Sequence, residues 1–119
     1  MNFKEWIKTI IESEHPNKKI IGYYFGIFES GKCQYTLYLS GSKEFDKEDD
    51  GWACDDDYKP KDKYLNLDQF QGLKWEDVLI NVVDMLRKFV KTDLYYNSFL
   101  AKAKGIATGF DGGDLVLIE

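Results

Sequence analysis

The chain has 119 residues, of which 44% are hydrophobic and 16% aromatic, and its formal net charge at pH 7 is −5. These values predict one globular domain over residues 1–119 and exclude an acidic disordered tail. No apolar run reaches the roughly 18 residues of a membrane span. A sequence pI near 4.9 argues against nucleic acid and anionic membranes as direct ligands, because both attract basic surfaces.

The first residues mix charged and apolar side chains and lack the apolar centre of a signal peptide. Two cysteines, Cys33 and Cys54, in a chain without an export signal are expected to be reduced thiols. We therefore expect a cytoplasmic protein.

The first third of the chain predicts one helix and a β-hairpin. Apolar residues recur at helical spacing over residues 3–13, with Asn2 as the N-cap. Residues 20–28 are rich in β-branched and aromatic side chains and predict a strand, which a hairpin turn at 29–32 follows. Residues 33–40 alternate, so the second strand should bury Cys33, Tyr35, Leu37 and Leu39 and leave Gln34, Thr36, Tyr38 and Ser40 on a partly solvated face.

The second half predicts mostly helix and ends in a hairpin. Residues 64–67 indicate a short strand, and an apolar stripe over residues 75–90 predicts a helix of about four turns. Residues 94–103 favour a short helix, and residues 105–119 a hairpin around Asp111-Gly112-Gly113. This order predicts an α+β fold, a single domain with an antiparallel sheet and helices packed on one face.

The segment 43–62, here called the acidic segment, carries the charge imbalance of the whole chain. It holds nine acidic residues and four lysines, a net −5, while the rest of the chain is balanced. Connections this long are uncommon in compact domains unless they are functional or disordered. We expect Trp52 to anchor the segment on the domain, so that its carboxylates point outward and attract a basic partner. The candidate partner-binding residues are Asp46, Glu48, Asp49, Asp50, Trp52, Asp55, Asp56, Asp57 and Tyr58, with the two aromatic residues as packing anchors.

Two other interpretations of the acidic segment stay open. It could be a solvated loop without a role, or it could bind calcium. The calcium hypothesis places acidic residues and Gly51 at positions 1, 3, 5, 6 and 12 of an EF-hand-like loop. Against it, the preceding element is predicted to be a strand, and position 12 is an aspartate where the bidentate ligand is usually glutamate. The residues in this register are Asp46, Glu48, Asp50, Gly51 and Asp57.

The sequence offers no catalytic constellation, so we expect neither an enzyme nor a cofactor. The single histidine, His15, has only Glu14 beside it and lies in a loop. Cys33 is predicted to be a buried strand residue, and the aspartates around Cys54 disfavour its thiolate. Gly22 and Gly26 lie within a strand, where they suit neighbouring aromatic rings better than a phosphate.

Four stretches carry a resemblance to a known family. They are residues 24–30 (Tyr-Phe-Gly-Ile-Phe-Glu-Ser), residues 38–46, the trio Trp52-Ala53-Cys54, and residues 106–114 (Ile-Ala-Thr-Gly-Phe-Asp-Gly-Gly-Asp). Together they resemble small acidic bacterial immunity proteins of polymorphic toxin systems, of the contact-dependent inhibition, Rhs and WapA types. The resemblance implies a cytoplasmic, non-catalytic protein that binds and neutralises a cognate toxin domain, often a basic nuclease.

The expected function is therefore that of an immunity protein with a basic toxin domain as its protein partner, and with neither nucleic acid nor membrane as a ligand. An acidic adaptor or regulatory domain is the alternative, followed by a calcium-binding domain. The polar strand face around Gln34, Thr36 and Tyr38 is the second candidate binding surface.

Overall fold

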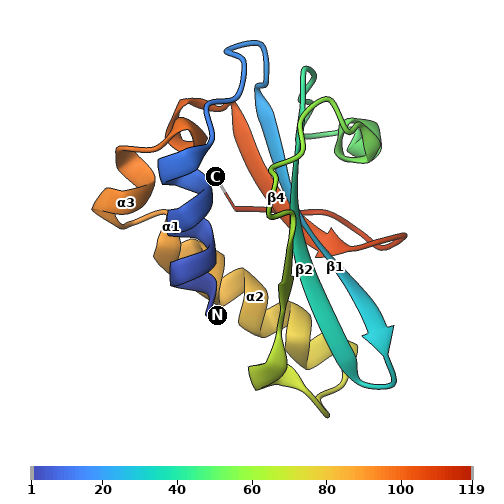
Figure 1. Ribbon diagram of the computed structural model, residues 1–119. Helices are drawn as coiled ribbons and strands as arrows, with labels where there is room; N and C mark the ends of the chain where they lie inside the picture. The colour runs from blue at the N-terminus through green and yellow to red at the C-terminus, as the bar shows by residue number, and fades with distance from the viewer. Residues whose placement is uncertain (1, 119) are drawn as a thin grey trace.

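In the computed structural model, which describes residues 2–118, a five-stranded sheet separates the helices from the acidic segment (Figure 1). The helices are α1 (Phe3–Ser13), α2 (Trp75–Phe89) and α3 (Asp93–Tyr96), and the 3-10 turns are η1 (Asp50–Cys54), η2 (Asp68–Phe70) and η3 (Phe99–Lys102). The strands are β1 (Gly22–Gly31), β2 (Gln34–Ser42), β3 (Tyr64–Asn66), β4 (Gly105–Phe110) and β5 (Val116–Leu117). The α+β class and the single domain are confirmed.

Helix α1 forms where the sequence predicts it, and its first turn is held by a capping box. The side chain of Asn2 accepts from the backbone N–H of Glu5, and Glu5 accepts in return from Asn2. Each bond satisfies a backbone N–H that has no partner inside the helix. The apolar stripe, which includes Trp6, Ile7 and Ile10, is buried against the sheet.

The β1–β2 hairpin is also formed, but its turn lies further along the chain than predicted. The register pairs Ile27 with Leu37 and shifts between Glu29 and Gly31, so that Cys33 lies in the turn. Cys33 has a positive φ of 53° and is half-buried, which corrects the expectation of a buried strand residue. The bulge moves the turn because it adds a residue to one strand without a partner on the other.

The sheet is mixed, which corrects the expectation of a purely antiparallel sheet. Its order is β3-β2-β1-β4-β5, and β4 runs parallel to β1, with Gly26 beside Gly109 in the register. After β3 the chain crosses the helical face as α2, α3 and η3, and it then enters the sheet on the far side of β1 (Figure 1). Such a crossover brings a strand back in its original direction, whereas a tight hairpin reverses it.

The two faces of the sheet are buried by different means. The helical face forms the main core, in which Phe25, Ile27, Leu37 and Leu39 are completely buried under the helices. The opposite face was predicted to be partly solvated, yet Thr36 and Ser40 are also buried there. This face carries a second, smaller cluster that the acidic segment covers, as described below.

The remaining elements agree with the sequence in type. Residues 93–102 form two short helical turns, and the C-terminal hairpin turns at Gly112, whose φ of +81° is one that glycine adopts without strain. The apolar stripe of α2 is buried from Val78 onward, but Trp75 is 55% exposed. Within the described residues, none of the helices has the length and apolar character needed to cross a membrane.

The capping box of α1 gives a direct test of the fold. Replacing Asn2 by Ala removes one half of it and should lower the free energy of unfolding by about 1 kcal/mol. Ser13→Ala is the matched control on the same helix, because the Ser13 hydroxyl bonds back to the carbonyl of Thr9 and caps nothing. Urea unfolding of both variants measures the difference, and equal losses would contradict the role of Asn2.

Candidate protein-binding surface

Trp52 fixes the middle of the acidic segment on the sheet. Its side chain is 4% exposed, and its ring lies so close to β1 that a Cβ added at Gly22 would be 2.9 Å from it. The ring of Phe45 packs against Trp52, with 5.0 Å between the centroids, and lies over Gly105 of β4. Two strand glycines thus provide a flat floor for two aromatic rings from the segment.

The burial of Trp52 has two consequences. It anchors the segment, as the sequence predicted, but leaves little of the indole for contact with a partner. It also leaves Nε1 of Trp52 buried without a hydrogen-bond partner among the described residues. Such a group costs about 1–3 kcal/mol, which the packing of the ring has to offset.

Tyr58 fixes the end of the acidic segment through backbone and side chain. Its backbone N–H and carbonyl pair with Gly41 at 3.0 and 2.9 Å, which extends the β2 edge by one bridge. Its hydroxyl donates to Oε1 of Glu14 at 3.0 Å, and its ring contacts Tyr23 and Phe99. Burial first, and then the hydrogen bond to Glu14, raise the pKa of Tyr58, so the phenol stays neutral and keeps donating.

Several of the predicted acidic residues also shape the segment itself. Asp57 accepts from the backbone N–H of Lys43 at 2.9 Å, and Asp55 accepts from the hydroxyl of Ser42 at 3.3 Å. Asp46 and Asp49 each accept from a backbone N–H two residues further along the chain. These bonds fix where the carboxylates point, which lowers the ordering cost of binding.

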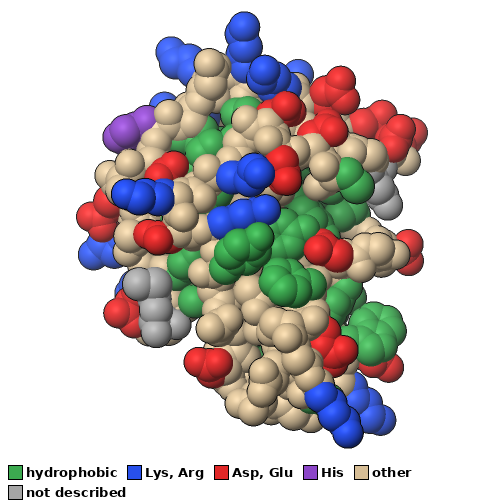
Figure 2. All heavy atoms as spheres, turned by 45° about the vertical axis from the view of Figure 1, so that its right-hand side comes forward, with side chains coloured by type: hydrophobic (Ala, Val, Ile, Leu, Met, Phe, Trp, Pro, Cys, Tyr) green, Lys and Arg blue, Asp and Glu red, His purple; other side chains and the backbone are tan. Residues whose placement is uncertain are grey.

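The carboxylates of the acidic segment gather on one side of the molecule, at the upper right of Figure 2. Among the predicted residues, Asp55 is half-buried, and the side chain of Asp50 lies outside the described part of the structure. The others are exposed: Asp46, Glu48, Asp49, Asp56 and Asp57.

The calcium hypothesis gains no support from this arrangement. The element before the segment is strand β2 rather than a helix. Among the described side chains, no three acidic, histidine or cysteine residues come together as a metal site would require. His15 and Cys54 are both exposed.

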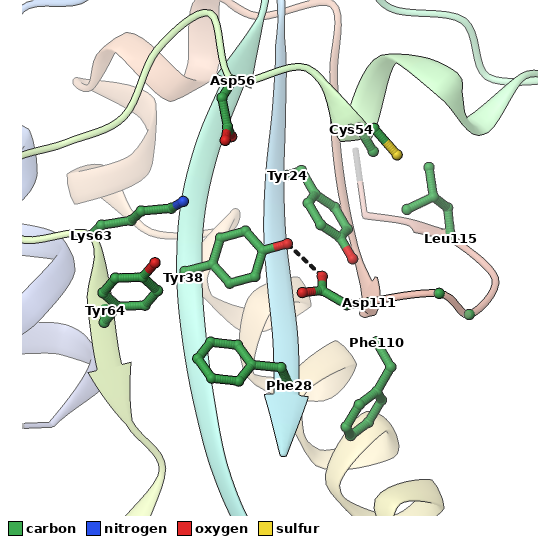
Figure 3. Close-up of a pocket in the computed structure, with 13 residues that line it drawn as sticks. Tyr24, Phe28, Tyr38, Cys54, Asp56, Lys63, Tyr64, Phe110, Asp111 and Leu115 are labelled. Carbon is green, nitrogen blue, oxygen red and sulfur yellow. Dashed lines mark hydrogen bonds between the residues drawn. The ribbon is translucent and has the colours of Figure 1, made fainter. Parts of the chain in front are cut away.

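An aromatic groove of about 550 Å³ lies beside the acidic segment, on the same face of the sheet (Figure 3). Its floor comes from β1 and β2, one wall from residues 53–56 and 63–64, and the other from the C-terminal hairpin. Its lining combines aromatic, charged and small side chains. Its aromatic and charged members include Phe28, Tyr38, Asp56, Lys63, Tyr64 and Asp111.

Tyr38 organises this groove. Its ring covers Gly26, where an added Cβ would be 2.1 Å from the ring, as expected for a strand glycine beside an aromatic residue. Its hydroxyl donates to Oδ1 of Asp111, which ties the C-terminal hairpin to β2 (Figure 3). Burial, the hydrogen bond to Asp111 and nearby charges raise the pKa of Tyr38.

Part of this surface was predictable from the sequence. Tyr38 belongs to the second candidate face, but Phe28, Lys63, Tyr64 and Asp111 were not predicted, and they come from four separate elements or loops. The available signal was the small residues at alternate positions of β4, together with Gly22 and Gly26 on β1, because a sheet face with so few side chains has to be covered by side chains from elsewhere.

The chain matches no protein-family model, and no significant match is found among curated proteins or solved structures.

If Trp52 anchors the acidic segment, Trp52→Ala should lower the free energy of unfolding by about 3–5 kcal/mol. The amide hydrogens of Lys43 and Asp55 should also exchange faster, since they bond within the segment. Trp75→Ala is the matched control, because that indole is 55% exposed. Chemical unfolding and hydrogen exchange measure both effects, and equal losses in the two variants would contradict the anchoring role.

The glycine floor gives a second test of the same surface. Gly105→Ala places a methyl group 2.1 Å from the ring of Phe45 and should cost about 1–3 kcal/mol through displacement of that ring. The control Gly51→Ala lies in the acidic segment itself, where the nearest atom is Oδ1 of Asp49 at 3.3 Å. Thermal unfolding compares the two, and a Gly105→Ala protein as stable as the control would refute the close contact.

Proposed function

We propose that this protein is a non-catalytic immunity protein that binds and neutralises a basic toxin domain in the cytoplasm through the acidic segment and its surroundings. One observation carries the proposal: a strongly negative segment is fixed on the sheet at Trp52 and Tyr58 while most of its carboxylates are exposed. The resemblance to immunity proteins supplies the class of partner.

The electrostatic part of the proposal follows from the placement of charge. An inhibitor has to reach its target before the target acts, so fast association matters as much as affinity. Carboxylates collected on one side of a domain attract a positively charged protein over a Debye length of about 8–10 Å at physiological salt. Because the segment is already ordered, the encounter does not have to fold it.

The biological test begins with affinity capture from a lysate of the source cells and identification of the bound protein. The captured protein should be basic, and its expression alone should arrest growth of a host strain. Co-expression of this protein should restore growth. A captured partner without toxicity would reject the immunity function and favour the alternative of an adaptor or regulatory domain.

A charge variant tests the role of the acidic segment. Glu48→Gln, Asp49→Asn and Asp56→Asn together keep the shapes of three exposed side chains, and the amide oxygen at position 49 can still accept from Gly51. Association with the captured partner should slow about tenfold at low salt and change little at high salt, because salt screens the removed attraction.

The matched control changes the net charge by the same amount on exposed helical positions, with Glu12→Gln, Glu76→Gln and Asp84→Asn. Stopped-flow measurements at several salt concentrations compare the two proteins. Equal slowing in both would show that only overall charge matters, and no slowing in the first would remove the acidic segment from the interface.

A further inference from the structure

The aromatic groove already holds a positive charge that comes from the protein itself. Nζ of Lys63 lies 4.9 Å from the ring centroid of Tyr38 and 5.3 Å from that of Tyr64. Both distances are within the 6 Å or so at which a ring face attracts a cation. The two rings meet at 62° with centroids 6.2 Å apart, and the same ammonium group lies over both. The groove therefore has the geometry of a cation receptor.

Contacts with the sheet and with neighbouring side chains fix the positions of the Tyr38 and Tyr64 rings. Tyr38 lies on Gly26 and donates to Asp111, and Phe28 contacts both Tyr38 and Tyr64, at 6.1 and 6.0 Å between centroids. Tyr64 is nevertheless 58% exposed. Large exposed aromatic side chains with polar groups around them are typical of the residues that dominate binding energy at interfaces.

The charges at the rim of the groove are mostly negative. Asp56 and Asp111 both line it and are exposed, against the single ammonium of Lys63 (Figure 3). The phenols of Tyr24 and Tyr38 are neutral, because burial and nearby carboxylates raise the pKa of each. The groove thus keeps a net negative charge beside aromatic faces, and it is continuous with the acidic segment through residues 53–56.

We propose that this groove receives an arginine side chain of the basic partner, with its guanidinium stacked on Tyr38 and Tyr64 in place of the Lys63 ammonium and paired with Asp56 or Asp111. Arginine suits the site better than lysine, because a planar guanidinium stacks on rings and binds carboxylates through two parallel hydrogen bonds. The inference rests on the proposed function for the identity of the partner, and it adds the position and chemistry of one anchor.

The test uses a small probe rather than the toxin. The peptide acetyl-Gly-Arg-Gly-amide is titrated into the 15N-labelled protein, and its neutral analogue with citrulline in place of arginine serves as the probe control. The arginine peptide should shift the amide signals of Lys63, Tyr64 and Gly112, with a dissociation constant in the millimolar range expected of a single side chain. The citrulline peptide should bind much more weakly.

Lys63 provides the discriminating variant. If its ammonium competes with the incoming guanidinium, Lys63→Gln should tighten arginine binding about threefold. Lys61→Gln, at an exposed lysine two residues away, should leave the affinity unchanged. Tyr64→Ala should weaken binding several-fold. Because Tyr64 is exposed, the variant should stay folded, and an amide spectrum unchanged away from the groove checks this.

Three results would overturn the proposal. The groove signals could stay unshifted by the arginine peptide, or shift equally with citrulline. The third result combines two observations: Lys63→Gln weakens binding of the arginine peptide, and acetyl-Gly-Glu-Gly-amide binds the wild type. The groove would then bind acidic groups through Lys63. Because the titration contains no toxin, its failure is distinguishable from failure of the immunity function, which the growth experiment decides separately.

Discussion

The architecture of the candidate surface depends on glycines in two neighbouring strands of the sheet, β1 and β4. On the face of β1 and β4 away from the helices, the Gly22–Gly105 and Gly26–Gly109 pairs carry no side chains, and between them Ala107 lies opposite Tyr24. The backbone N–H and carbonyl groups here already bond to neighbouring strands, so this surface offers water few hydrogen bonds. Rings from elsewhere in the chain cover it, and the acidic segment is ordered because it supplies two of those rings.

Negative charge and hydrophobic packing therefore occupy the same segment for a physical reason. Carboxylates alone would repel one another and leave a long loop disordered, whereas a buried indole and a buried ring hold the loop against that repulsion. Aspartates that accept hydrogen bonds from backbone N–H groups contribute a second constraint, because each bond fixes the local conformation of the segment. The result is a charged surface with little freedom to rearrange.

Local signals in the sequence predicted most elements, because spacing and turn residues act over short distances. The stripe of α1, its Asn2 cap and the turn at Gly112 belong to this class. The parallel pairing of β1 with β4 was missed, since nothing in either strand specifies a partner some 80 residues away. The same limit applies to the surface. Trp52 was recognisable as an anchor within its acidic surroundings, but the groove is assembled from Phe28, Tyr38, Lys63 and Asp111, which only the tertiary fold brings together.

The parallel pairing also sets an order of events during synthesis. Strand β1 has β2 as its neighbour almost at once, but its other neighbour comes from residues 105–110, after both long helices. The floor beneath Phe45 lies on that late strand, and so does the residue that precedes Asp111. A chain without β4 therefore lacks the glycine beneath the ring of Phe45 and the strand that leads to Asp111. The charged surface should therefore become complete only when residues 105–110 have joined the sheet, rather than gradually along the chain.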